Sequence, residues 1–495
     1  MYLLLKGHDY EYEIKMLLNL FFHDEKYEIV EEVTADGVTI ETIICEDYFK
    51  AIYYKNGKII ETSSFDKNYI KDLPSESLEK RKQSKKLLKI LLYNVASKIT
   101  GIKQPWGILT GIRPTKIVFD LIEKYGHEEE KVRYYLEDYY KISPLKVDLM
   151  MEIARNEIKI LKTNEDNEIN IYLGIPFCPT RCLYCSFTSY PIDKWISHVM
   201  DYLHALDKEM QYVSKELLIG KKVKTIYVGG GTPTSLNAQQ LEVFMRMINK
   251  HFNVESLEEF TVEAGRPDTI NTEKLNALKE YGVTRISINP QTMNDKTLEI
   301  IGRRHTVRDI YSAYSKARKA GFDNINMDLI LGLPGETFLD VKQTMEQIKK
   351  LNPESLTVHT MAVKRASRLK ETLDKYDLSS DKTIREMIDM VYHESKSIGL
   401  NPYYMYRQKN MVGNYENVGY CSIGNECIYN IEIMEEAQSI IALGAGAASK
   451  VVYKHENRIE RIENVKNVEQ YINRIDEMID RKRKFFNESK NNIYK

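Results

Sequence analysis

The sequence predicts an α/β protein built around a partial (β/α)6 barrel, with an α+β domain before it and a mostly helical region after it. From residue 169 onward, short runs of β-branched residues alternate with amphipathic helical stretches. This alternation is typical of βαβ units that form a parallel sheet. Six such units are visible, too few for a fully closed barrel of this type. Before residue 165 the strand-like runs precede the helix-like ones, which predicts a separate domain.

Residues 1–165 are predicted to form this α+β domain, and the sequence does not identify its role. Strand-like runs separated by Asp36-Gly37 and Asn56-Gly57 predict β-hairpins, because these dipeptides favour tight two-residue turns. Apolar residues at helical spacing predict a helix over about 80–100, and further helices are expected over 115–163. The polar run Lys162–Glu168 predicts a linker that ends the domain.

The barrel is predicted over residues 166–360. Its strand candidates are Ile169–Leu173, Thr225–Val228, Glu259–Glu263, Arg285–Asn289, Asn324–Leu329 and Ser355–His359. The expected helices lie at about 195–217, 237–252, 272–281, 293–301, 307–320 and 337–350. In such barrels the active site lies at the carboxyl ends of the strands. Residues 361–495 are expected to be more helical and to cover the substrate.

Composition excludes several classes of protein. The 495 residues are 43% hydrophobic and 29% charged, which is ordinary for a globular protein. A formal net charge of −1 gives no basic footprint for nucleic acid. No segment is long and apolar enough to predict a membrane span. Six cysteines in a chain of this length do not predict a disulfide framework, and a cytoplasmic protein is expected.

The most informative motif is Cys178-x3-Cys182-x2-Cys185, which directly follows the first barrel strand. Iron–sulfur clusters are held by cysteine thiolates, and three protein ligands leave one iron of a cubane cluster open to an outside molecule. A zinc knuckle or a set of buried apolar cysteines is the alternative. A structural zinc site closes with four ligands, and no histidine follows the triplet closely enough to complete one.

A glycine-rich loop, Gly229-Gly230-Gly-Thr232-Pro-Thr234, follows the second strand. Glycines allow a ligand to approach the backbone closely. A run of this kind is often only a tight turn. Its position at the functional end of the barrel favours a role in binding the amino group of a cofactor.

Polar side chains end or interrupt three later strands or their loops, at Glu263, Gln291 and Asp328. Burying a carboxylate is unfavourable unless it is paired, so these groups either satisfy internal hydrogen bonds or face a shared polar ligand. Arg303 is a candidate for binding a cofactor carboxylate in bidentate fashion. Both interpretations remain open at this stage.

Four other residues have a weaker signal. Tyr172 lies in the first strand, facing the barrel, and is either a core aromatic or a site residue. His359, at the end of the sixth strand, is a candidate substrate contact, although a single histidine is more often structural. Cys421 and Cys427 form a Cys-x5-Cys pair without a third soft ligand nearby, which favours a structural role over a second metal site.

Taken together, these motifs resemble the radical-SAM family of oxygen-independent coproporphyrinogen III oxidases, also called coproporphyrinogen dehydrogenases. The resemblance covers roughly residues 169–450 and looks most like the HemZ branch. The matching pieces are Tyr172-x-x-Ile-Pro-Phe-Cys178, Cys182-x-Tyr-Cys185, Gly229-Gly-Gly-Thr-Pro-Thr234, Glu263, Gln291, Gly302-Arg303 and Asp328-Leu-Ile-x-Gly-Leu-Pro334.

The resemblance implies a [4Fe–4S] cluster on the three cysteines and S-adenosylmethionine (SAM) as the second cofactor. It implies oxidative decarboxylation of two propionates of coproporphyrinogen III, giving protoporphyrinogen IX for haem synthesis, with a reducing donor such as flavodoxin or ferredoxin. It implies a position for Tyr172 near both cofactors, with a catalytic role. The implied SAM contacts are Tyr172, Gly229, Gly230, Thr232, Glu263, Gln291, Arg303 and Asp328.

Two positions depart from the family pattern. Phe187 stands where the best-studied oxidases have a further cysteine, and Gly174 stands where they have histidine. Phe187 is typical of the related haem-binding chaperones, so a chaperone is one alternative and another porphyrin-modifying radical-SAM enzyme is a second. The candidates for binding the substrate's propionates are Arg181, Lys364, Arg365 and Arg368.

Overall fold

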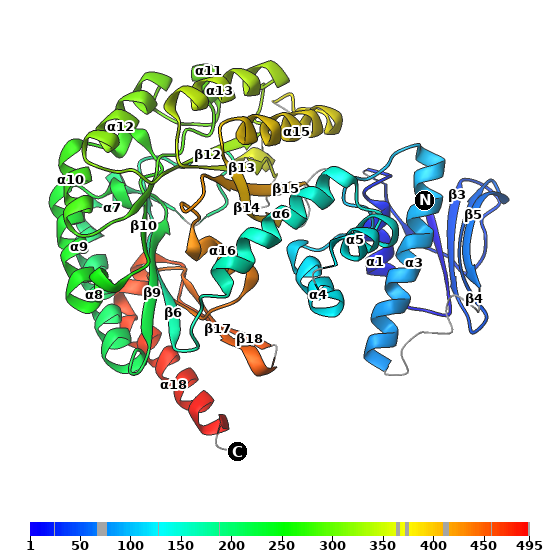
Figure 1. Ribbon diagram of the computed structural model, residues 1–495, viewed down its shortest axis with the longest axis horizontal. Coiled ribbons are helices and arrows are strands. Elements are labelled where there is room, and N and C mark those ends of the chain that lie inside the picture. The colour runs from blue at the N-terminus through cyan, green and yellow to red at the C-terminus, as the bar shows by residue number, and fades with distance from the viewer. Residues whose placement is uncertain are drawn as a thin grey trace. The chain divides into compact units, whose positions relative to one another are not determined.

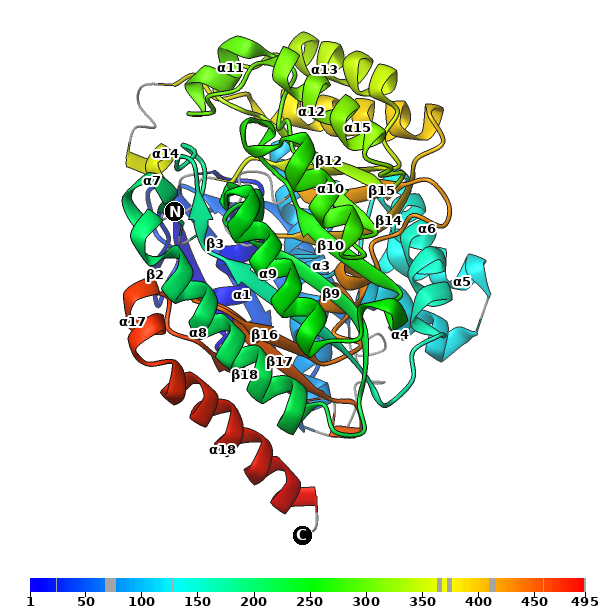
Figure 2. The same cartoon turned by 90° about the vertical axis from the view of Figure 1, so that its left-hand side faces the viewer.

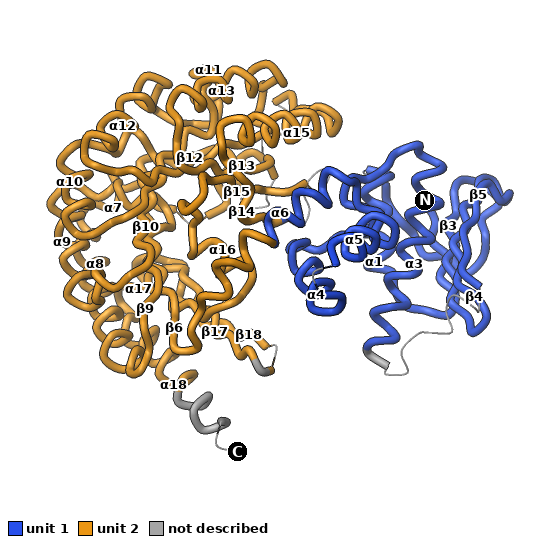
Figure 3. The backbone as a smooth tube through the Cα atoms, in the orientation of Figure 1, with its two compact units in different colours: residues 1–154, 407–414 blue, residues 155–406, 415–495 orange. Residues whose placement is uncertain are grey.

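The computed structural model describes residues 1–23, 25–66, 77–126, 128–187, 189–362, 367–371, 376–408, 415–456 and 458–493. It forms two compact units (Figure 3), of which the first contains Met1–Ala154 and Arg407–Asn414. The second contains Arg155–Tyr406 and Tyr415–Lys495. The N-terminal segment of the first unit thus ends at residue 154. The second unit includes both the expected barrel and the expected C-terminal region.

The first unit contains a five-stranded sheet in the order β2-β1-β3-β4-β5, and helix α3 packs on β4 and β5. The hairpin at Asn56-Gly57 is confirmed, because both residues have the positive φ that a type I′ turn requires. The hairpin expected at Asp36-Gly37 is wrong, because β1 lies between β2 and β3 in the sheet. The elements are β1 (Tyr2–Lys6), α1 (Glu11–Leu18), β2 (Glu28–Ile29), β3 (Val38–Ile44), β4 (Tyr48–Lys55), β5 (Lys58–Asp66), α3 (Ser77–Thr100), α4 (Thr115–Tyr125), α5 (Glu129–Tyr134) and α6 (Pro144–Leu161), which runs on into the second unit.

The six expected barrel strands are present and neighbouring strands pair in parallel. They are β6 (Glu168–Ile175), β9 (Lys222–Gly230), β10 (Glu259–Glu263), β11 (Arg285–Ser287), β12 (Ile325–Leu331) and β13 (Ser355–Thr360). Helices follow the strands and cover the outer face of the sheet (Figures 1 and 2). The strands are largely buried, and along them apolar residues alternate with buried polar residues such as Thr261, Asn326 and Thr357. These helices are α8 (Val199–Tyr212), α9 (Ala238–His251), α10 (Thr272–Glu280), α11 (Asp295–Ile300), α12 (Val307–Lys319) and α13 (Phe338–Leu351).

The C-terminal region contains the expected helices and also five strands that extend the barrel sheet at both edges. Among the described residues the sheet has 11 strands in the order β14-β15-β13-β12-β11-β10-β9-β6-β16-β17-β18, and its two edge strands are not hydrogen-bonded to each other. The added elements are α14 (Arg368–Glu371), α15 (Asp381–Ser397), β14 (Asn401–Arg407), β15 (Glu416–Cys421), α16 (Ile428–Glu435), β16 (Ile440–Leu443), β17 (Ala448–Tyr453), β18 (Arg458–Glu463), α17 (Val468–Asn473) and α18 (Ile475–Ile493). No helix within the described ranges is long and apolar enough to cross a membrane.

Residues 422–432, here called the floor segment, close the barrel at the amino ends of its strands. Arg285, the first residue of β11, donates to the carbonyl oxygen of Asn425 at 2.9 Å. Glu259, the first residue of β10, accepts from the backbone N–H of Ile428 at 2.7 Å. Helix α16, which begins in this segment, lies on the inner side of the sheet (Figure 1). The opposite end of the barrel therefore remains for the loops that carry the predicted site.

Candidate cofactor site

The three predicted cluster cysteines lie on one loop, here called the cluster loop (residues 177–187), which follows β6. Its start forms β7 (Phe177–Cys178), which pairs with β8 (Tyr190–Pro191). The Thr180 hydroxyl donates to the carbonyl oxygen of Gly302 at 3.1 Å, and the Leu183 N–H donates to that of Ile301 at 3.0 Å. The cluster loop is thus fixed to the segment that follows α11, and none of its cysteines forms a disulfide.

The chemistry of the cysteine triplet fits an iron–sulfur cluster, because free cysteine thiols are the donors that such clusters take from proteins. Within the described residues, no three His, Cys, Asp or Glu side chains converge as they would around one ion. In a cubane cluster each cysteine binds a different iron, so the sulfur atoms do not need to meet at one point. Two polar groups also approach the sulfurs: Thr232 Oγ1 lies 3.5 Å from Cys178 Sγ, and Arg266 Nη1 donates to Cys182 Sγ at 3.8 Å.

The glycine-rich loop packs directly on the cluster loop. The N–H of Gly231 donates to the carbonyl oxygen of Ile175, and that of Thr232 donates to Phe177, both at 2.7 Å. A Cβ atom on Gly231 would lie 2.5 Å from that Phe177 oxygen and 3.0 Å from Cys178 Sγ, so a side chain does not fit there. Gly230 adopts a φ of 111°, which disfavours other residues. The glycines thus allow this close approach.

The expected carboxylates meet inside the barrel. Glu263, at the end of β10, accepts a hydrogen bond of 2.7 Å from the Tyr227 hydroxyl. Burial raises the pKa of Glu263 to about 7. The hydrogen bond from Tyr227 lowers this pKa, and the negative charge of Asp328 raises it. Asp328, on β12, accepts from Asn326 at 2.7 Å and lies 3.7 Å from His359 Nε2. The structure thus places His359 beside a predicted site residue.

Gln291 and Arg303 form hydrogen bonds within the barrel that the sequence alone does not indicate. Gln291 has a φ of 69° and its N–H donates to the carbonyl oxygen of Asp328 at 2.9 Å. Arg303 Nη1 donates to the carbonyl oxygens of Gly265 and Asn289, at 3.1 and 2.6 Å, and Nη2 donates to the Tyr184 hydroxyl at 3.1 Å. Its Nε is buried without a hydrogen-bond partner among the described residues. Arg303 therefore links the loops after β10 and β11 to the cluster loop.

Tyr172 belongs to a stack of three tyrosines in the barrel interior. Its ring centroid lies 6.2 Å from that of Tyr227 and 6.4 Å from that of Tyr429, and the last two are 4.6 Å apart. Burial raises the pKa of Tyr172. Tyr227 on β9 is paired in register with Tyr172 on β6. Because both lie in predicted neighbouring strands, the sequence contained a signal for this contact. Tyr429 comes from the floor segment, and nothing in the local sequence points to it.

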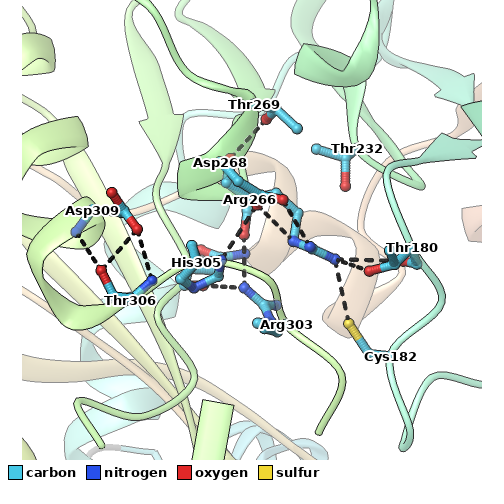
Figure 4. A network of polar contacts seen from close by, with 12 residues as sticks. Thr180, Cys182, Thr232, Arg266, Asp268, Thr269, Arg303, His305, Thr306 and Asp309 are labelled. Atoms are coloured by element: carbon cyan, nitrogen blue, oxygen red, sulfur yellow. Dashed lines mark hydrogen bonds and ion pairs between the residues drawn. The ribbon is translucent and has the colours of Figure 1, made fainter. Parts of the chain in front are cut away.

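Sequence reasoning missed a buried polar network beside the cluster loop (Figure 4). Arg266 binds both carboxylate oxygens of Asp268, at 3.0 and 2.9 Å, and its Nη1 reaches Thr180 Oγ1 at 3.1 Å and Cys182 Sγ. The ring of His305 lies 3.3 Å from Asp268 Oδ1 through Nδ1. The sequence contained one signal for this network: Arg266 lies between a glycine and a proline, just after the strand that ends in Glu263.

The other candidates are placed as follows. Cys421 and Cys427 lie in a buried cluster with Tyr403 and Tyr404, where burial raises the pKa of both thiols. Arg368 is exposed on α14, and the N–H of the next residue, Leu369, donates to the cluster-loop carbonyl of Leu183 at 3.0 Å. Arg181 lies in the cluster loop itself. Lys364 and Arg365 lie outside the described residues.

The pKa of Glu263 predicts a stability effect that depends on pH. The folded state holds this proton more tightly than the unfolded chain, so the carboxyl lowers stability as pH rises from 4.5 through about 7. Glu263→Gln is therefore expected to raise the free energy of unfolding by up to roughly 3 kcal/mol at about pH 8 and to change it little at about pH 5. Urea denaturation at both pH values measures this, with the exposed Glu273→Gln as control. An equal effect of Glu263→Gln at both pH values contradicts it.

The chain is similar in sequence to proteins of known families. The model of the radical SAM superfamily matches residues 172–348. The oxygen-independent coproporphyrinogen-III oxidase-like protein HemZ of Bacillus subtilis is 43% identical over 408 residues, which are 82% of this chain and 81% of HemZ. The heme chaperone HemW of the same organism is 35% identical over 280 residues, 56% of this chain and 69% of HemW.

The fold is similar to a solved structure, the coproporphyrinogen III oxidase HemN from Escherichia coli, described as a radical SAM enzyme. The TM-score is 0.52 at 21% sequence identity, and the match covers 65% of this chain and 72% of that chain. At this identity the likeness establishes the fold, and it agrees with the partial barrel predicted from the sequence.

Proposed function

Because the chain belongs to the radical SAM superfamily, in the family of the coproporphyrinogen-III oxidase-like protein HemZ, we propose that it oxidatively decarboxylates coproporphyrinogen III to protoporphyrinogen IX. Its cofactors are a [4Fe–4S] cluster and SAM. The observation that carries the proposal is the meeting of the cluster loop, the glycine-rich loop and the strand-end carboxylates in one barrel. Gly231 contacts the cluster loop at Cys178, and Glu263 lies against Gly229.

We assign the cluster to Cys178, Cys182 and Cys185. Bound together, the cluster and SAM supply a carbon radical that can take a hydrogen atom from a substrate. The proposed SAM contacts are Tyr172, Gly229, Gly230, Thr232, Glu263, Gln291, Arg303 and Asp328. Glu263 and Asp328 offer acceptors for the cofactor's hydroxyl groups, and the unpaired Nε of Arg303 offers a donor.

Each of the two propionate side chains is converted to a vinyl group in the same way. The side chain loses one hydrogen atom to the radical, one molecule of carbon dioxide, and one electron to an acceptor, which leaves a vinyl group. The protein has to orient the substrate and exclude water while this occurs. The tyrosine stack, which includes Tyr429 of the floor segment, supports such a role, because it packs aromatic rings in the barrel interior.

A haem chaperone is the second candidate, and one residue favours it. Phe187 stands two residues after Cys185, where the best-studied oxidases have a further cysteine, and its side chain is 66% exposed. An exposed aromatic ring at the end of the cluster loop is suited to contact with a flat apolar macrocycle. The relationship to a heme chaperone supports the same alternative.

One anaerobic experiment separates the two functions. The reconstituted protein is incubated with SAM, a low-potential reductant and coproporphyrinogen III, and tetrapyrroles are analysed by mass spectrometry. The oxidase is expected to produce a species that has lost one carbon dioxide and then one that has lost two. Stable retention of added haem with no loss of carbon dioxide from coproporphyrinogen contradicts the oxidase and favours the chaperone.

Asp328→Ala is expected to weaken SAM binding about three- to tenfold while the cluster is retained, because it removes an acceptor from the proposed cofactor site. Equilibrium binding of SAM to the oxidised, cluster-loaded protein measures the change. Asp323→Ala is the matched control, since Asp323 is exposed just before the amino end of the same strand. Equal affinity in the Asp328 variant and the wild type removes Asp328 from the proposed site.

A further inference from the structure

Arg266 is a buried cation next to the cluster loop that the proposed function does not use. It lies in the loop after β10 and only 3% of its surface is exposed. Its charge is paired with Asp268, whose pKa is lowered by Arg266 and His305 against the effect of burial. A buried ion pair needs well-oriented hydrogen bonds to be tolerated. The geometry of those bonds therefore indicates where the guanidinium is directed.

Asp268 binds one side of the Arg266 guanidinium, and the other side faces the cluster loop. Asp268 accepts from Nε and Nη2, which is the bidentate arrangement that fixes the plane of an arginine. The remaining nitrogen, Nη1, points to Thr180 and Cys182 (Figure 4). It donates to Cys182 Sγ at 3.8 Å, and Cys182 is itself buried. Asp268 is held in turn by His305, on the segment after α11.

An N–H donor directed at a cysteine sulfur has a defined effect on an iron–sulfur cluster. Hydrogen bonds to the sulfurs and the local charge are among the factors that set the reduction potential. A cationic donor withdraws electron density from the thiolate and stabilises the added electron, so it makes the cluster easier to reduce. Partners behind the ligating residues also fix the orientation of the ligands.

We propose that Arg266 is a positioning residue for the cluster: it orients Cys182 through a directed N–H···S hydrogen bond and thereby raises the reduction potential of the cluster. Asp268 and His305 hold it in that orientation. The inference rests on the proposed ligation of the cluster by Cys178, Cys182 and Cys185. It adds a residue that tunes electron entry without contacting SAM or substrate.

The test is a redox titration of the anaerobic, cluster-loaded protein without SAM, followed by electron paramagnetic resonance of the reduced cluster. Arg266→Gln is expected to lower the ratio of reduced to oxidised cluster about tenfold at a fixed potential, which is 59 mV for a one-electron couple. Arg266→Lys, which keeps the charge without the planar fork, is expected to lower it as well. The exposed Arg304→Gln carries the same charge change as Arg266→Gln and is expected to titrate like the wild type.

The outcomes separate this inference from the cluster assignment. A wild-type protein that binds no iron and sulfide contradicts the ligation itself. A loaded Arg266→Gln protein with the wild-type ratio contradicts only the role of Arg266, and a wild-type ratio in Arg266→Lys shows that charge alone suffices, without a directed bond. If neither Arg266 variant folds, Asp268→Asn is titrated. Losing a negative charge alone raises the ratio, so a lower ratio supports the proposal and an equal or higher ratio contradicts it.

Discussion

Cys182→Ala is expected to abolish the [4Fe–4S] cluster. The variant should lose the charge-transfer absorption that reduction bleaches in the reconstituted wild type, and SAM cleavage should fall to the level of reductant alone. The physical reason is that two thiolates cannot hold a cubane cluster that already has one iron without a protein ligand. Iron and sulfide analysis together with the absorption spectrum measures the loss.

The matched control is Cys421→Ala, which removes a buried thiol in the same unit, from the core cluster that contains Tyr403 and Tyr404. This variant is expected to keep a full complement of iron and sulfide. Loss of the cluster in folded Cys421→Ala protein, or its retention in Cys182→Ala, contradicts the assigned ligands.

Arg285→Met is expected to give the largest loss of stability. Arg285 is fully buried and its guanidinium donates to Asn324 Oδ1 at 2.9 Å, to the carbonyl oxygen of Asn425 at 2.9 Å and to Ser355 Oγ at 2.7 Å. The methionine leaves the buried Ser355 Oγ and two half-buried oxygens without this donor, so the free energy of unfolding should fall by about 3–5 kcal/mol. The floor segment should then open more readily, because Asn425 loses its link to β11.

Hydrogen exchange followed by mass spectrometry measures this change in residues 422–432 and in β11, separately from the first unit. Arg308→Met is the control, because Arg308 is exposed on α12 and loses the same charge. Exchange in the floor segment that matches the wild type would mean that Arg285 does not hold this segment in place.

The barrel and its cofactor loops could be predicted from the sequence because their signals are local. Each parallel strand is a short run in which β-branched and other apolar residues recur at alternate positions, and each helix that follows has its own periodicity. Thr306 and Thr337 also begin their helices with capping boxes that the sequence carries within four residues. The cluster loop and the glycine-rich loop follow strands directly, so the fold places them at one end of the barrel.

The rest of the site depends on contacts between distant segments. Tyr429 meets Tyr172 only because the floor segment enters the barrel from the C-terminal region, and Cys427 meets Glu259 for the same reason. Strands β14 and β18 are the edge strands of the sheet, and β15, β17 and β18 pair antiparallel to their neighbours, so this region does not repeat the regular strand–helix alternation of the barrel. The orientation of Arg266 depends on its bidentate contact with Asp268, and the sequence alone does not predict the geometry of that contact.

The proposed reaction is tested most directly by tracing hydrogen from substrate to cofactor. Coproporphyrinogen III labelled with deuterium in its propionate side chains is incubated anaerobically with the cluster-loaded protein, SAM and reductant. The 5′-deoxyadenosine formed is expected to carry deuterium in step with the release of carbon dioxide, and both signals should vanish in Cys182→Ala. Unlabelled 5′-deoxyadenosine formed without release of carbon dioxide would contradict decarboxylation as the function of this protein.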